Sequence, residues 1–271
     1  MRRGAGGGGA AKTLRPYVPQ VREEAVASFR ERYPGLRFEP AVVVIAAYDE
    51  EGAIGAVVDA VPAQACGIGV STLVIDDGSA DRTTAVALDH GAHVATLRRN
   101  CGHGVALRLG YELAREYGAQ YIATMDGDGE WDPADIPGVL QPLVDDEADF
   151  VVGSRVLGRD EADDAVRRAG VRTFALLIRL LTGTKVTDTS SAVRALRVEV
   201  TERVRQTQVQ YQTSELLIGA IAAGYRVTER PVSHRSRMAG ESKKGANLLY
   251  GFRYAEVIVK TWWRERRARR V

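Results

Sequence analysis

The sequence predicts an α/β fold whose core is a mostly parallel sheet with helices on both faces. Short apolar runs rich in β-branched residues alternate with stretches of helical periodicity along most of the chain. The runs begin roughly every 20 to 30 residues, the size of a βαβ unit, and near-continuous apolar strands are typical of sheets buried on both faces. The expected strands cover residues 41–47, 72–75, 93–97, 121–125 and 150–152, and the expected helices cover 53–63, 80–90, 105–117 and 134–144.

The composition is that of an ordinary globular protein, with 45% hydrophobic and 27% charged residues in a chain of 271. This length suits one large domain with appendages. The net charge of +2 does not indicate a protein that coats nucleic acid, and no nucleic-acid partner is expected. Cys66 and Cys101 form no paired framework, so we expect the reducing cytoplasm. No apolar run approaches the roughly 18 residues that a membrane-spanning helix needs.

The chain divides into three expected parts. Residues 1–37 form an N-terminal extension, with a Gly/Ala-rich stretch that we expect to be disordered and a short charged helix at 21–32. Residues 38–244 form the α/β domain, and residues 245–271 form an amphipathic helix and a basic tail.

The expected C-terminal helix, over residues 245–263, has one apolar face and is followed by a cationic segment. That face holds Leu248, Phe252, Ala255, Val259 and Trp262, and five arginines follow within residues 264–270. Aromatic anchors beside a cationic tail suit the interface of an anionic membrane. A helix that packs on its own domain, with a solvated tail, is the alternative.

Polar residues follow each expected strand. They are YDEE at 48–51, DDGS at 76–79, RRN at 98–100, DGD at 126–128 and GSR at 153–155. The carboxyl ends of parallel strands meet at one edge of a sheet, and ligands bind outside that edge. The sequence therefore predicts a single site there, whose charges suit a metal ion and a polyanion.

The segment Asp126-Gly127-Asp128-Gly129-Glu130 is the expected metal site. Two carboxylates two residues apart in extended backbone point the same way, and hard divalent cations prefer oxygen ligands. The glycines permit unusual backbone angles and close approach of a ligand. Mg²⁺ or Mn²⁺ held there would neutralise a departing diphosphate. A plain acidic turn is the alternative; a calcium loop is disfavoured, because Glu130 and Trp131 stand where that loop has Asp or Asn and then Gly.

The adjacent carboxylates Asp76 and Asp77 follow the second expected strand. Ser79 or Asp81 can cap the next helix, but capping leaves the Asp pair unexplained. A carboxylate there could accept from the N–H of a uracil or guanine edge or from a ribose hydroxyl. A capped turn without ligand is the alternative.

Two other loops attract attention. Residues 100–104 (NCGHG) precede a helix and are superficially like a phosphate-binding loop, but they lack the full dinucleotide fingerprint and follow the third strand, which excludes a Rossmann dehydrogenase. Near the C-terminus, Arg235, Arg237, Lys243 and Lys244 surround Gly240-Glu241-Ser242, which suits a flap that closes over phosphates. A solvated basic loop is the alternative. The four histidines have no zinc-site spacing and are expected to be packed or solvated.

These segments occur in one order with fitting gaps: AAYDEE, VIDDGSADRT, NCGHGVALRLG, MDGDGEWDP, VVGSR and SHRSRMAGESKK. The chain thereby resembles the large inverting glycosyltransferase family 2, which includes dolichol-phosphate mannose synthase and bacterial polyprenyl-phosphate glycosyltransferases. The resemblance runs from about residue 41 to 264. It implies a GT-A fold, a single α/β domain with a nucleotide half and an acceptor half.

The resemblance also implies roles for particular positions. The metal ligands would be Asp126, Asp128 and Glu130. The nucleotide-sugar would be bound by Ala47, Tyr48, Glu50, Asp76, Asp77, Gly104, Asp126, Gly127 and Ser242. The residues that carry the reaction or hold the phosphates would be Asp128, Arg155, Glu215, Arg237 and Lys243. The chain departs from the family at Asp49 (usually Asn), at His103 (often Lys) and at Ser191-Ala192-Val193-Arg194 (usually Ser-Gly-Phe-Arg), so the donor site is expected to be intact and the acceptor is left open.

The expected reaction is sugar transfer from a UDP- or GDP-sugar, with Mg²⁺ or Mn²⁺, by direct displacement at the anomeric carbon. The expected acceptor is a polyprenyl phosphate, met by a peripheral enzyme on the inner face of a membrane. A phosphate acceptor is ionised near neutral pH and needs no strong base, whereas an alcohol would need one, with Asp188 or Glu215 as candidates. The alternatives are a soluble transferase acting on a small acceptor, a catalytically silent nucleotide-sugar-binding protein, and a nucleotidyltransferase.

Overall fold

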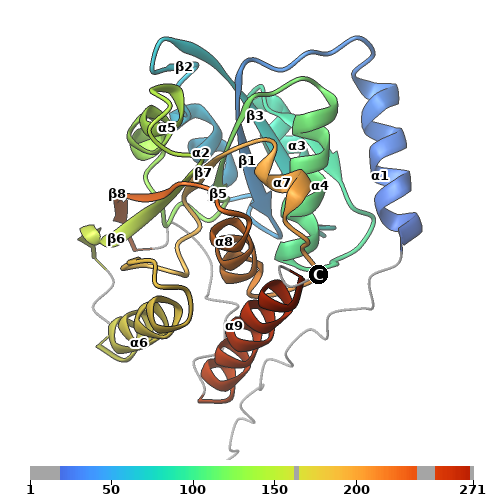
Figure 1. Cartoon of the computed structure of the whole chain (residues 1–271). Coiled ribbons are helices and arrows are strands. Elements are labelled where there is room, and N and C mark those ends of the chain that lie inside the picture. The colour runs from blue at the N-terminus through green and yellow to red at the C-terminus, as the bar shows by residue number, and fades with distance from the viewer. Residues whose placement is uncertain (1–18, 162–164, 237–247, 269–271) are drawn as a thin grey trace, which may run out of the picture.

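The computed structural model describes residues 19–161, 165–236 and 248–268. Within these residues the chain forms an eight-stranded sheet in the order β2-β3-β1-β5-β7-β6-β8, with β4 paired to β3 (Figure 1). All strands but two run in the same direction: β2 is antiparallel to β3, and β7 is antiparallel to both β5 and β6. The strands are β1 (Ala41–Ala47), β2 (Gln64–Ala65), β3 (Ile68–Asp76), β4 (His93–Thr96), β5 (Tyr121–Asp126), β6 (Phe150–Asp160), β7 (Arg194–Arg197) and β8 (Val227–His234).

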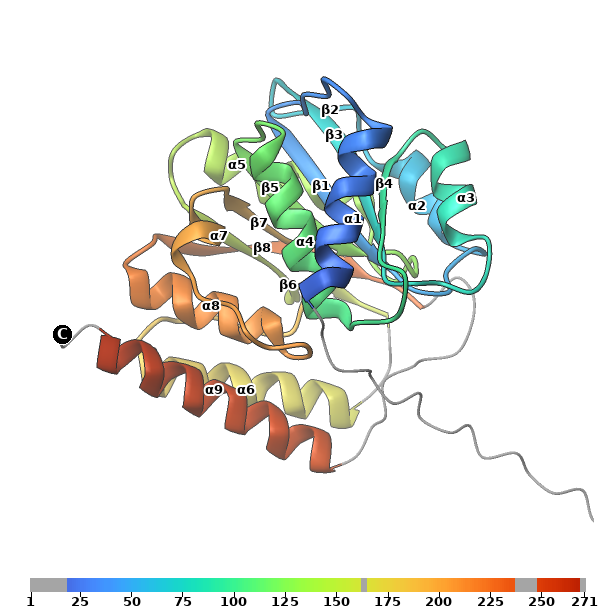
Figure 2. The same cartoon turned by 90° about the vertical axis from the view of Figure 1, so that its right-hand side faces the viewer.

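Helices cover both faces of this sheet, as the sequence predicts. The helices are α1 (Pro19–Arg32), α2 (Ile54–Ala60), α3 (Thr83–Asp89), α4 (His103–Glu116), α5 (Ile136–Val144), α6 (Ala165–Thr182), α7 (Val200–Arg203), α8 (Gln212–Ala223) and α9 (Leu248–Ala268), with one 3₁₀ turn, η1 (Pro133–Asp135). α1, α4 and α8 share one core with the sheet, and α2, α3 and α5 share the other. α6 and α9 lie side by side beyond α8 (Figure 2).

Strand β1 shows why the apolar runs are unbroken. Val42, Val44 and Ala46 enter the core on the α4 side, whereas Val43 and Ile45 enter the core on the α2 side. A strand buried on both faces has no position for a polar residue, because successive side chains point to opposite faces. The expected strand at residues 41–47 is therefore confirmed with the same bounds.

The C-terminal half of the chain departs most from expectation. β6 continues past the expected residue 152 to Asp160 and pairs with β8 across an irregularity between Ser154 and Arg159. β7, β8 and α6 were not expected as elements, and α8 was expected only as the helix that the family resemblance implies around Glu215. α1 is the expected short helix, and its buried Val21 and Phe29 join the core that includes α4, while the boundary between residues 37 and 38 stays a prediction.

The C-terminal helix packs through a different face from the expected one. Tyr254, Ile258 and Thr261 are buried, whereas Phe252 is 73% exposed and Val259 is 44% exposed. In the described residues no helix is both long and apolar enough to cross a membrane.

Candidate active site at the carboxyl edge of the sheet

The register of the central strands brings the expected donor-site residues to one edge. Ala47 at the end of β1 pairs with Asp76 at the end of β3, and Ala46 pairs with Asp126 at the end of β5. Asp126 Oδ1 lies 2.8 Å from Nε2 of His103, the first residue of α4. His103, noted in the sequence as a departure from the family pattern, thus contacts the first carboxylate of the DGD segment.

The turn that follows β5 is tightly built. The Gly127 N–H donates to Ala46 O (3.1 Å), and a Cβ at Gly127 would lie 3.1 Å from side-chain atoms of Ala47 and Ile54. Gly129 has φ of +74°, which favours glycine. Asp128 is 4% exposed, and its Oδ1 accepts from the Glu130 N–H (3.1 Å). Both carboxylates are therefore held at the strand end, as the sequence predicts.

The donor chemistry of this turn suits Mg²⁺ or Mn²⁺. Among the described residues, no three His, Cys, Asp or Glu side chains are grouped to hold a metal ion by themselves. Mg²⁺ is commonly bound through one or two carboxylates, with substrate phosphates and water completing its coordination. Asp126 and Asp128 supply two carboxylates, and Glu130 supplies a third nearby in the chain. The residues present fit an ion that is bound together with a diphosphate.

Asp76 and Asp77 both hold loops in place. Asp77 accepts from the backbone N–H groups of Cys101 and Gly102, each at 2.7 Å. Burial raises the pKa of Asp77 to about 6, although these two hydrogen bonds act in the opposite direction. Asp76 Oδ1 accepts from Ser79 N (2.8 Å), and its Oδ2 accepts from a threonine hydroxyl of α3. The acidic pair therefore fixes two loops: Asp77 binds the loop before α4, and Asp76 binds the turn before α3 and α3 itself.

The loop after β1 is joined to the loop after β3 through acidic side chains. Asp49, with φ of +52°, accepts from Ala80 N (2.8 Å). The Glu50 N–H donates to the Thr83 hydroxyl (2.8 Å). Of the two expected caps of α3, Ser79 and Asp81, neither is the N-cap residue, which is Arg82; Asp81 lies one residue earlier, and its Oδ1 accepts from Thr83 N (2.9 Å). These contacts fix Tyr48 and Glu50 beside the edge.

A buried arginine on β6 packs against Trp131, the residue that follows the DGDGE segment. Arg155, on β6, is 4% exposed and forms a two-point ion pair with Asp188 (Nε–Oδ2 2.6 Å and Nη2–Oδ1 3.2 Å). The Trp131 ring lies against it, 5.2 Å from Cζ, and Nη2 also donates to the Ser190 hydroxyl (2.8 Å). In the described part of the chain, Nη1 is buried and has no hydrogen-bond partner. Burial alone would raise the pKa of Asp188, but the guanidinium holds it below its usual range.

His234, at the end of β8, was not expected in the site. It is 1% exposed, with Nδ1 2.9 Å from Asp160 Oδ1 and Nε2 3.4 Å from Glu130 Oε2. The Trp131 ring meets it edge-on at 4.7 Å between centroids. The sequence signal that could have placed His234 in the site is its position at the end of a strand. Its contact with Glu130 could not be read from the sequence, because the two residues are 104 positions apart.

The other expected residues are dispersed. Glu215 is fully buried on α8, where its carboxylate binds the 207–208 loop and Arg264 of α9. Gly104 lies in the first turn of α4, and its N–H donates to Val209 O (2.8 Å). Arg237, Ser242 and Lys243 lie outside the described residues.

A mostly parallel sheet with acidic turns after β1, β3 and β5 is the architecture of GT-A glycosyltransferases. The chain belongs to this class and is a member of Glycosyl transferase family 2, whose family model matches residues 42–205. This confirms the family, the fold and the enzyme class expected from the sequence.

Relatives and solved structures agree with this assignment. The dolichyl-phosphate hexose transferase of Haloferax volcanii is 34% identical over 206 residues, which cover 76% of this chain and 87% of that protein. The dodecaprenyl-phosphate galacturonate synthase of Rhizobium johnstonii is 28% identical, with 77% of this chain and 62% of that protein covered. Among solved structures, glucosyl-3-phosphoglycerate synthase from Mycobacterium tuberculosis, in complex with Mg²⁺ and uridine diphosphate, matches with a TM-score of 0.64 at 19% identity, over 93% of this chain and 85% of that one. The last likeness concerns the fold alone.

Proposed function

We propose that the enzyme transfers a hexose-type sugar from a UDP- or GDP-sugar to the phosphate of a polyprenyl phosphate. One observation carries the proposal: Trp131, three residues after Asp128 in the turn that follows β5, packs against a buried arginine that has an unpartnered N–H donor. The carboxylates suit a cation bound with the donor diphosphate, and the guanidinium suits a phosphate.

Each group then has a defined task. Asp126 and Asp128, with Glu130, would hold Mg²⁺ or Mn²⁺, and the bound ion would offset the charge that develops on the departing diphosphate. His103 orients Asp126 through their 2.8 Å contact. Arg155 Nη1 is directed to the phosphate of the acceptor. An ionised phosphate oxygen attacks the anomeric carbon directly, so no side chain has to remove a proton.

A lipid acceptor is supported by the outer surface of α6 and α9. Large apolar side chains there are exposed: Leu176, Leu180, Phe252, Val259 and Trp263, at 44 to 75%. Exposed cations lie on the same two helices: Arg172, Arg179, Arg253, Lys260, Arg266 and Arg267. Apolar and aromatic groups interleaved with cations fit the interface of an anionic bilayer. The printed names of two relatives, dolichyl-phosphate hexose transferase and dodecaprenyl-phosphate galacturonate synthase, point to the same class of acceptor.

The donor proposal is tested by calorimetry of UDP and GDP with Mn²⁺ or Mg²⁺. Asp126→Ala and Asp128→Ala should each abolish metal-dependent binding, while Asp145→Ala, an exposed carboxylate at the end of α5, should leave it unchanged. Full-strength, metal-dependent binding by both site variants would refute the metal assignment.

The acceptor proposal is tested with vesicles that contain anionic lipid. Replacing Leu180, Phe252 and Trp263 together by Gln should release the protein from the vesicles and slow transfer to a lipid phosphate, because it removes exposed apolar area without touching the core. Binding should also weaken as salt screens the cations. Equal rates with a water-soluble phosphorylated acceptor, with or without vesicles, would show that the acceptor is not a lipid. Membrane binding on the cytoplasmic side belongs to the same proposal.

A further inference from the structure

Glu215 is buried without access to a substrate, yet its carboxylate is fully engaged. Oε2 accepts from the backbone N–H groups of Thr207 (2.8 Å) and Gln208 (2.9 Å). Oε1 accepts from the Thr207 hydroxyl (2.9 Å) and from Arg264 Nη1 (2.8 Å). A carboxylate that accepts this many hydrogen bonds is not available for acid or base chemistry. Its role is therefore to position the groups that it binds.

It holds a loop, residues 206–211, that closes against the start of α4. Gln208 O accepts from Arg108 Nη1 (2.6 Å), and Val209 O accepts from Gly104 N (2.8 Å). The approach is so close that a Cβ at Gly104 would lie 2.4 Å from Gln208 O. The position of this loop therefore fixes the first turn of α4.

The first turn of α4 belongs to the donor edge. Its residue His103 contacts Asp126, and the preceding amides of Cys101 and Gly102 are bound by Asp77. Contacts therefore run without a gap from the 206–211 loop through Gly104 to His103, the side chain that contacts a carboxylate of the DGD turn.

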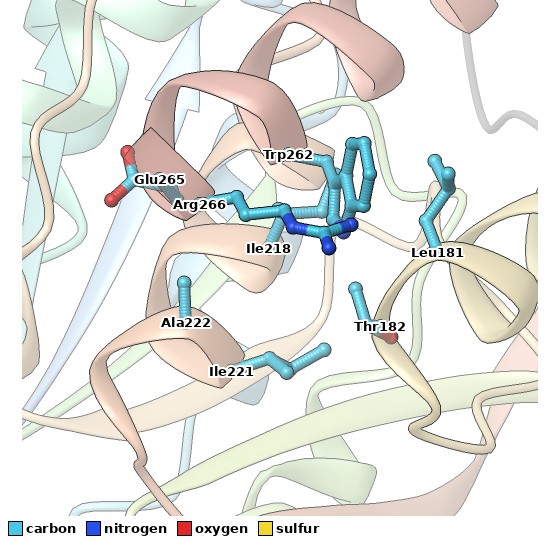
Figure 3. A pocket seen from close by; sticks show the side chains of 8 residues that line it. All are labelled: Leu181, Thr182, Ile218, Ile221, Ala222, Trp262, Glu265 and Arg266. Carbon is cyan, nitrogen blue, oxygen red and sulfur yellow. The ribbon is translucent and has the colours of Figure 1, made fainter. Parts of the chain in front are cut away.

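The other end of this chain of contacts is α9. Arg264 also donates to Arg205 O (2.8 Å), so it joins α9 both to Glu215 and to the start of the loop. Close to Arg264, a pocket of about 230 Å³ lies between α9 and α8. Trp262 and Arg266 of α9 and Ile221 of α8 are among the side chains that line it (Figure 3). The polar contact of Arg264 therefore sets how the C-terminal part of α9 sits on the domain.

We propose that the Arg264–Glu215 ion pair makes the affinity for the nucleotide donor depend on how α9 is packed on the domain. Glu215 is a positioning residue: through it, the position of α9 on the domain affects the position of the first turn of α4. The inference rests on the proposed function only in taking the DGD edge as the donor site. If α9 lies on a membrane, the same contacts connect the membrane-bound surface to the donor edge.

The experiment compares Glu215→Gln and Arg264→Gln with wild type in calorimetry of UDP and Mg²⁺. We expect the Kd for UDP to rise about 5-fold or more in each variant, since coupling between sites is typically of that size. The double variant should bind UDP no more weakly than the weaker-binding single variant, because both substitutions break the same ion pair. Arg264→Lys, which keeps the cation, should recover most of the affinity. Glu256→Gln is the matched control: Glu256 is an exposed α9 carboxylate paired with Lys260.

Hydrogen exchange separates coupling from mere loss of stability. The amides of residues 101–104 should exchange faster in Glu215→Gln and Arg264→Gln, while the amides of β1 stay protected. A lowered melting temperature with unchanged UDP affinity and unchanged exchange at 101–104 would overturn the inference. The Arg264 side chain is 27% exposed and that of Glu215 is 0% exposed, so Arg264→Gln is expected to disturb the fold less than Glu215→Gln and serves as the second variant. Failure of wild type to bind any nucleoside diphosphate would refute the donor proposal, whereas exchange at 101–104 would still decide the coupling.

Discussion

Removing the carboxylate of Asp188 tests whether this residue positions Arg155 or acts as a base. The side chains of Asp188 and Arg155 are 0% and 3% exposed, so Asp188→Ala leaves a buried, uncompensated guanidinium. Breaking a buried pair in this way costs about 3 to 5 kcal/mol. For a domain of this size that corresponds to a fall in melting temperature of roughly 6 to 20 °C. Asp188→Asn, which keeps the shape and one acceptor, should lie at the lower end.

The activity should fall further than stability alone explains. On the proposed function, Arg155 Nη1 donates to the acceptor phosphate; Asp188 orients this donor, and the loss of one such donor is worth about 100-fold or more in kcat. Differential scanning calorimetry and steady-state rates at a temperature where both proteins are folded measure the two effects. Asp146→Asn is the control, because that carboxylate is 73% exposed in its pairs with Arg197 and Arg226 and should change stability by less than about 1 kcal/mol.

The pH profile decides between the two roles. The pKa of Asp188 is held below its usual range, so a positioning carboxylate leaves the shape of the kcat profile unchanged in Asp188→Asn. A base would give an acid limb that disappears in the variant. Loss of that limb, or a stability change no larger than that of the control, would refute the reasoning.

Three further outcomes follow from the loops around the edge. The pKa of the Asp77 carboxyl rises from 3.8 in the unfolded chain to about 6 in the folded protein, so its contribution to the free energy of unfolding falls as pH rises toward 6 and then levels off. In urea unfolding, wild type should therefore lose roughly 1 kcal/mol of stability relative to Asp77→Asn between pH 5 and pH 7. Gly104→Ala places a Cβ 2.4 Å from the backbone oxygen of Gln208, so the free energy of unfolding should fall by about 1 to 3 kcal/mol in the same assay and UDP should bind more weakly. Unchanged stability and affinity would show that the 206–211 loop can move away from the added methyl group. Tyr254→Phe removes a hydroxyl that donates to Thr189 O (3.0 Å) and should cost about 1 to 2 kcal/mol in chemical denaturation while UDP binding is unchanged.

The donor half was predictable because its signals are local. A run of buried β-branched residues followed directly by acidic residues and glycine specifies strand, turn and edge within about ten positions, as at Tyr121 to Glu130. The metal and nucleotide roles of these residues stay predictions. The C-terminal half has no such signal: β8 is only partly buried and contains Pro231, and β7 has four residues.

Contacts between distant segments could not be read from the sequence. Arg155 meets Asp188 across 33 positions, and Glu215 meets Arg264 across 49. The face of α9 was misjudged for a related reason, since its periodicity permits two apolar faces. Tertiary packing buries Tyr254 and Ile258 and leaves Phe252 outside.

Strand β7 has a consequence for how members of this family could acquire new acceptors. Because it runs against β5 and β6, its first residue lies at the edge where those strands end, and the segment 187–193 opens onto that edge. This segment is tied to the acceptor side through Arg155 and Glu229, whereas the donor turns are tied to one another through β1, β3 and α4. On the proposed function, exchanging residues 187–193 between relatives should therefore transplant acceptor selectivity, and the hydroxyl of Thr124 on β5, which donates to Ala192 O (2.6 Å), is a contact of this segment with the donor strands that the exchange has to keep.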